Sequence, residues 1–124
     1  MTTLTDYARD ILARAIAARG PVLPTQVFAG LGTGGTASAG LTGEPTGSGY
    51  ARQRVTFTGT GAQSNAEALR FIFTAAAGTL THVGLFDAAS GGNPLAFVAL
   101  PQPAAMTGPG TVTIATGSLA LTAG

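Results

Sequence analysis

Residues 30–35 read Gly-Leu-Gly-Thr-Gly-Gly, the glycine spacing of a dinucleotide-binding turn. Such a turn holds a pyrophosphate only where it follows a strand and opens a helix, because the free N–H groups and the dipole of the helix N-terminus bind the phosphates. Residues 27–29 fit a strand, but residues 36–50 are rich in glycine and proline and show no helical period. No acidic residue follows about 20 positions later to bind a ribose. We therefore expect residues 32–50 to form an exposed, mobile glycine-rich loop and no nucleotide site.

The titratable side chains that could do acid–base chemistry are few and dispersed. His82 is the single histidine and lies in a strand-like segment without a second histidine, a cysteine or an acid pair beside it. A hydrogen-bonded structural role is therefore expected for His82. Glu67 and Asp87 are the one pair of acids on neighbouring strand candidates, as a glycosidase would need. Asp87 also precedes the turn-forming Ser-Gly-Gly-Asn run, which favours a turn-capping role instead.

Three arginines and one tyrosine remain as candidates for ligand binding. Arg52, Arg54 and Arg70 could bind an anionic ligand, but solvated sheet faces or pairs between subunits explain them more simply. Tyr50 is the one aromatic side chain outside the predicted helix suited to stacking on a sugar, and the chain has no tryptophan. We expect no catalytic, cofactor-binding or metal-ligating residues, and we predict that the protein is not an enzyme.

Charge and composition narrow the possible partners. Only 9% of the 124 residues are charged, the net charge is +1, and all six basic residues are scattered arginines. This distribution lacks the clustered basic face of a nucleic-acid-binding protein. The apolar runs are short and interrupted, which predicts neither a membrane span nor a signal peptide, and we expect synthesis in the cytoplasm of the producing cell. Because small side chains dominate, the core of one copy is thin, and this predicts a homo-oligomer.

The elements that would position these residues begin with an amphipathic helix over residues 1–20. Its apolar residues recur at i, i+3, i+4 and i+7 spacing, and Thr3 with Asp6 resembles a capping box. Asp10 and Arg14 are spaced for an ion pair, and Gly20-Pro21 is a stop signal. We expect the helix to pack on the protein's own sheet, with docking on a neighbouring subunit as the alternative.

Short strand candidates follow over residues 25–124, separated by glycine-rich breaks. Val55 and Phe57 alternate with Arg54, Thr56 and Thr58, and residues 89–94 have the composition of a hairpin turn. Strands without intervening helices are typical of an antiparallel β-sandwich or barrel. We predict one domain over residues 1–124, mainly β, in which the N-terminal helix precedes an antiparallel β-sandwich of about seven short strands over residues 25–124. The candidates are residues 25–31, 52–59, 68–75, 80–88, 94–100, 110–116 and 118–123.

Four blocks of sequence occur in an order that resembles small virion proteins of tailed bacteriophages, often labelled phage tail fibre proteins. These blocks are LTDYA (4–8), GSGYARQRVTF (47–57), THVGLFDAASGGNPL (81–95) and GTVTIATGSLALT (110–122). The resemblance implies a structural component of a phage particle, located in the virion and in contact with major capsid or tail proteins.

The position on the particle is a separate question. The chain has no heptad or collagen-like repeat of the kind that builds a fibrous shaft. We therefore expect a capsid-surface decoration protein, a cement or head-spike subunit that forms a homotrimer. The alternatives are a tail fibre, a tail or baseplate adaptor, and a receptor- or carbohydrate-binding module.

Overall fold

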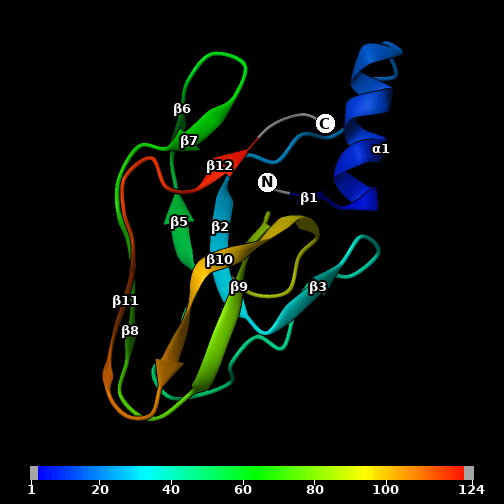
Figure 1. The fold of residues 1–124 in the computed structure, drawn as a ribbon. Helices are drawn as coiled ribbons and strands as arrows, with labels where there is room; N and C mark the ends of the chain where they lie inside the picture. The colour runs from blue at the N-terminus through cyan, green and yellow to red at the C-terminus, as the bar shows by residue number, and fades with distance from the viewer. Residues whose placement is uncertain (1–2, 122–124) are drawn as a thin grey trace.

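The computed structural model describes residues 3–121, which form a mainly β structure with one helix near the N-terminus (Figure 1). This confirms the predicted fold class. The described elements are β1 (Thr3–Leu4), α1 (Asp6–Ile16), β2 (Val27–Gly32), β3 (Gly34–Thr36), β4 (Gly40–Thr42), β5 (Gln53–Val55), β6 (Phe57–Thr58), β7 (Gln63–Asn65), β8 (Leu69–Phe73), β9 (Gly78–Phe86), β10 (Pro94–Met106), β11 (Gly110–Ile114) and β12 (Ala120–Leu121).

The largest sheet has five antiparallel strands in the order β1-β10-β9-β2-β5. Its long hairpin joins β9 to β10 through the predicted turn over residues 89–94, and Pro94 lies opposite Phe86. Asp87 caps this turn as predicted, since its carboxylate accepts hydrogen bonds from the Asn93 backbone N–H (2.7 Å) and side-chain amide (3.0 Å).

A ribbon of β8 and β11 packs over this sheet and encloses the core. Alternation buries Leu69, Phe71 and Phe73 of β8 and leaves Arg70 and Ile72 exposed. These side chains join Leu31, Leu80 and Leu85 of the main sheet in one apolar cluster. The three-stranded sheet β12-β7-β6 lies beside this core.

Helix α1 is shorter than predicted, and its N-cap is Thr5, not Thr3. Thr3 cannot cap because it pairs with Phe97 in β1. The fully buried Thr5 hydroxyl accepts a hydrogen bond from the Ala8 N–H (3.2 Å) and donates to the Pro94 carbonyl (2.6 Å). The expected Asp10–Arg14 ion pair is present at 3.1 Å on the exposed face.

The helix ends at Ile16, before the expected Gly20-Pro21 stop, because Ala18 adopts a left-handed backbone conformation with φ of 59°. The Arg19 N–H then donates to the Arg14 carbonyl at 2.8 Å, which closes the last turn. Of the described helix residues Ile11 alone is buried. The helix therefore packs on the protein's own sheet only through the inner edge of its apolar stripe.

The expectation of a mobile loop over residues 32–50 is wrong for its first half. Residues 34–42 form the hairpin β3–β4, which lies against β10 and β9. A Cβ at Gly35 would collide with the Phe97 ring, so the glycine lets the hairpin backbone lie directly on that ring. The glycine content of this segment, which indicated a loop, instead allows close packing.

Each of the seven strand candidates contains a strand, although most are shorter than their sequence windows. The second candidate is split into β5 and β6, and the last contributes Ala120–Leu121, while residues 122–123 lie outside the described residues. β1, β3, β4 and β7 were not predicted. These strands have two or three residues each, too few to show an alternation.

Candidate functional site

The glycine motif lies in and beside β2, where its first glycine faces a polar cluster. Gly30 and Gly32 belong to β2, and Gly34 and Gly35 to β3, so no helix follows the motif. A Cβ at Gly30 would lie 2.6 Å from both Glu44 Oε2 and the Tyr50 hydroxyl. The space that a nucleotide would need at this position is therefore filled by the protein's own side chains.

These side chains form what we call the Glu44 network, consisting of Glu44, Tyr50 and Arg52. The Arg52 guanidinium binds both carboxylate oxygens of Glu44, at 2.8 and 2.9 Å, and the Tyr50 hydroxyl donates to Oε2 at 2.5 Å. Arg52 also donates to the carbonyls of Ala88 and Gly91, both at 2.9 Å, and lies 3.6 Å from the centre of the Phe86 ring. The network thus joins the 44–52 segment to the β9–β10 turn.

Burial and hydrogen bonding act in opposite directions on the Glu44 carboxylate. Burial raises its pKa, but the hydrogen bonds from Arg52 and Tyr50 and the charge of Arg52 outweigh this effect and lower the pKa below 4.5. Burial and the bond to Glu44 raise the pKa of Tyr50. Glu44 therefore stays ionised and Tyr50 protonated at neutral pH, so neither group is poised to exchange a proton.

The network corrects the predicted placement of Arg52 and disfavours the alternative role of Tyr50. Arg52 does not lie on a solvated face or pair with another subunit, because its side chain is 9% exposed and bound within its own chain. Tyr50 is not a free platform for a sugar, since its ring stacks on Phe71 and Phe73 with centroids 6.4 and 5.9 Å away. Arg54 and Arg70 are exposed, as expected. The sequence signal for this network is weak: Glu44 is the one charged residue in a polar, glycine-rich stretch.

The other catalytic candidates do not converge. His82 Nδ1 lies 2.8 Å from the Thr81 hydroxyl, which donates in turn to the Thr33 carbonyl at 2.9 Å. Asp87 holds its turn, and its pKa is lowered because bonds from Asn93 outweigh the effect of burial. Glu67 precedes β8, which pairs with β11 and not with β9, so Glu67 and Asp87 are not on adjacent strands. Within residues 3–121 no group of three potential metal ligands occurs.

Asn65 is a structural residue that the sequence did not reveal. It is 1% exposed, and its amide donates to the carbonyls of Glu67 (2.8 Å) and Ala115 (3.0 Å). Its Oδ1 accepts from the Leu119 N–H at 2.9 Å. Asn65 therefore holds the turn that brings β12 beside β7.

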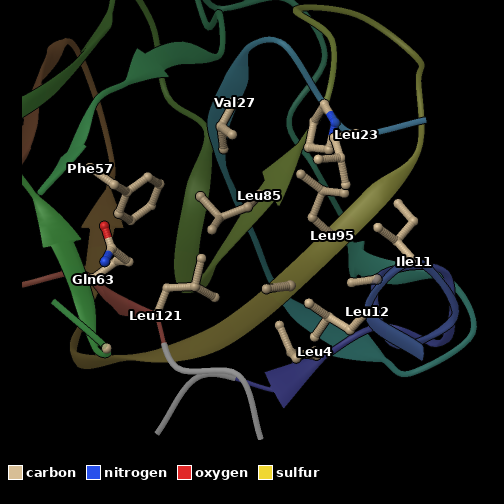
Figure 2. A pocket seen from close by; sticks show the side chains of 14 residues that line it. Leu4, Ile11, Leu12, Leu23, Val27, Phe57, Gln63, Leu85, Leu95 and Leu121 are labelled. Atoms are coloured by element: carbon tan, nitrogen blue, oxygen red, sulfur yellow. The ribbon is translucent and has the colours of Figure 1, made fainter. Parts of the chain in front are cut away.

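An apolar pocket with a volume of about 290 Å³ lies between α1 and the main sheet. Figure 2 shows Leu4 and Leu12 on the helix side, Phe57 and Leu121 across from them, and Leu85 and Leu95 on the sheet. We call it the α1 pocket. The full lining set is Leu4, Ala8, Ile11, Leu12, Leu23, Pro24, Val27, Phe57, Gly61, Gln63, Leu85, Leu95, Ala96 and Leu121.

Exposed large apolar side chains gather on the same part of the chain. Five of the six in residues 3–121 lie between positions 7 and 23, and the sixth is Ile72 on β8. Ile16 is 89% exposed and Val22 86%, while Leu12 and Leu23 are partly covered and line the pocket. An apolar surface next to an apolar pocket is typical of a protein–protein interface.

A second, larger groove of about 940 Å³ lies between β10 and the β11–β12 region. Pro101 and Pro103 stand in its β10 wall, where the pairing with β9 is interrupted between Ala99 and Ala104. Proline has no N–H to donate, so this edge is protected against pairing with another strand. The α1 pocket is therefore the better candidate for a contact surface. No helix in residues 3–121 is long and apolar enough to cross a membrane.

The model of a family described as "Gp80: Podophage GP4 fiber I protein gp80" matches residues 3–122, nearly the whole chain. No curated protein matches the chain.

Proposed function

The chain belongs to the podophage GP4 fiber I protein family and is a virion-associated structural protein of the fibre type; we propose that it works without catalysis, by binding other virion subunits through the α1 pocket and the apolar side chains around it. The observation that carries this proposal is the location of the exposed apolar residues. Tyr7, Leu12, Ile16, Val22 and Leu23 lie on one helix and the segment that follows it. Surfaces of this kind bury apolar area when subunits associate.

The non-catalytic role is supported by how the titratable groups are used. Glu44 is bound to Arg52, Asp87 caps a turn, and His82 is hydrogen-bonded to its neighbouring threonine. An active site would need such groups to converge on a space that a substrate can enter. The α1 pocket, the more apolar of the two concavities, is lined by no charged side chain.

The position on the particle has two candidates. The family's description names a fibre protein, which favours a fibre or the adaptor that carries it. The second candidate is the position on the capsid surface that was expected from the sequence. The short strands and the lack of any shaft repeat favour it. A carbohydrate-binding role is disfavoured, because the Tyr50 ring is stacked inside the protein. In either position the subunit self-associates, as a trimer, at the virion surface after synthesis in the host cytoplasm.

Gold-labelled antibodies against the purified protein, imaged on intact virions, test the proposal. Label on fibres or at the tail supports the first candidate, and label spread over the capsid supports the second. Mass spectrometry of purified virions is the control for incorporation. A particle that contains none of this chain, although it is made in infected cells, would refute both positions.

A further inference from the structure

The first two elements, β1 and α1, form a terminal piece that we call the N-terminal arm (residues 3–16). β1 is the edge strand of the main sheet and pairs with β10. Directly after it, the Thr5 N–H donates to the Leu95 carbonyl at 3.0 Å and the Asp6 N–H to the Ala37 carbonyl at 2.8 Å. These bonds join the arm to parts of the chain far from it in sequence, so any copy that presents the same sheet edge can receive the arm.

The linker between the arm and β2, residues 17–26, is held only loosely. All of its residues except Pro21 are exposed. Within the described part of the chain, residues 20–26 make no backbone–backbone hydrogen bond, and only Leu23 and Pro24 of the linker line the α1 pocket. Seven residues span at most about 23–25 Å when extended, which is enough to carry the arm to an adjacent copy.

The junction between the arm and the linker adopts a conformation that its sequence opposes. Ala17, Ala18 and Arg19 are strong helix formers, and the apolar period predicts a helix over residues 1–20. The helix nevertheless ends at Ile16, because Ala18 adopts a left-handed φ of 59°, which is uncommon for a residue with a Cβ. Folding the arm onto its own sheet therefore strains this junction, and continuing the helix through Arg19 would relieve the strain.

We propose that the N-terminal arm is exchanged between subunits, so that β1 and α1 of one copy bind the sheet edge of a second copy, with residues 17–19 helical. This inference rests on the proposed function, since it names the segment through which the subunits self-associate. The occupant of the edge is a second copy because the structure shows this same arm bound there. The closed and exchanged forms share these contacts and differ at the hinge. An arm passed from each copy to the next around an axis closes a ring, such as the proposed trimer.

Cross-linking between two single-cysteine variants tests the exchange, because the chain has no cysteine of its own. Asp6→Cys marks the arm and Ser38→Cys marks the β3–β4 turn beside it. Both positions are exposed, and the Asp6 N–H bonds the carbonyl of Ala37, the neighbour of Ser38. The two variants are produced together in one cell and treated with a short bismaleimide. Only a link between copies can then join positions 6 and 38, and we expect a linked dimer on a denaturing gel.

Asp6→Cys combined with Arg54→Cys is the matched control, since Arg54 is exposed on β5, at the opposite edge of the main sheet from β1. This pair should give no linked dimer. If the protein self-associates but positions 6 and 38 are linked only within the double variant Asp6→Cys/Ser38→Cys, the exchange is overturned. A chain that stays monomeric at high concentration, yet is present in purified virions, would refute this inference and leave the virion role intact.

Substitutions at Ala18 in the same pair of variants test the hinge. Valine opposes the left-handed backbone of the closed form, whereas glycine adopts it freely. We expect Ala18→Val to give at least about fivefold more linked dimer than Ala18→Gly. Circular dichroism checks that both variants are folded. Equal yields of linked dimer from the two would overturn the proposal.

Discussion

Replacing Arg52 with methionine removes the cation of the Glu44 network while keeping a long apolar stem. The change deletes two bonds to Glu44, at 2.8 and 2.9 Å, two bonds to the carbonyls of Ala88 and Gly91, and the contact with the Phe86 ring. Breaking a buried ion pair from one side costs about 3–5 kcal/mol, because the remaining charge is left unpaired. The Glu44 side chain is 24% exposed, so solvent screens part of this loss.

We therefore expect Arg52→Met to lower the free energy of unfolding by about 2–4 kcal/mol at pH 7. In urea unfolding followed by circular dichroism, a slope of about 1.5–2 kcal/mol/M converts this into a midpoint about 1–2.7 M lower. Arg54→Met is the matched control, since Arg54 is exposed, and its effect should stay within about 0.5 kcal/mol.

The stability difference between wild type and Arg52→Met should change with pH, whereas a simple packing defect would give a difference that does not. In the wild type the folded-state pKa of Glu44 lies below its unfolded value, so its contribution to stability is present above the unfolded pKa and is lost as pH falls through the folded pKa. Without Arg52, burial raises the folded pKa, and the variant is favoured by protonation of Glu44. The stability difference between wild type and Arg52→Met should therefore shrink as pH falls from 7 to 3. A difference under about 0.5 kcal/mol at pH 7, or one that does not change with pH, would refute the reasoning.

Two further substitutions test other parts of the fold. Asn65→Ala leaves the Leu119 N–H and the carbonyls of Glu67 and Ala115 without their buried partner. It should lower the free energy of unfolding in urea by about 2–3 kcal/mol. An unchanged midpoint would show that the turn does not depend on this amide. Ala18→Gly should stabilise the protein by about 0.5–1 kcal/mol, because glycine adopts the observed φ of 59° without the steric penalty of a Cβ, and a lower thermal midpoint would contradict this account of the helix end.

Much of the fold is predictable from the sequence because alternation and turn composition act locally. The Val55–Phe57 alternation and the residue types of the 89–94 turn place β5, β6 and the β9–β10 hairpin correctly. The helix is found by its apolar period, but its ends are not. Thr5 caps it by accepting a hydrogen bond from the Ala8 N–H, and the same hydroxyl donates to the carbonyls of Pro94 and Leu95 about 90 positions away, contacts that no local pattern encodes.

The residues whose surroundings were predicted wrongly make contacts with residues far away in the sequence. Gly35 lies in the segment predicted as a flexible loop, yet it faces the Phe97 ring, which a methyl group would displace. Arg52 precedes β5, so alternation says nothing about its direction, and its partners lie eight residues before it and nearly forty after it. The α1 pocket was not predicted either, because its walls come from the helix, the main sheet and the β12-β7-β6 sheet together.

The position of Tyr50 has a practical consequence for spectroscopy. The chain has no tryptophan and two tyrosines, and of these Tyr7 is 37% exposed on the helix while Tyr50 is held between Glu44 and two phenylalanine rings. A phenol fixed in an asymmetric setting gives near-ultraviolet circular dichroism, whereas a freely rotating one gives little. That band therefore serves as a built-in optical gauge of whether the 44–52 segment is closed onto the sheet, and it needs no added dye.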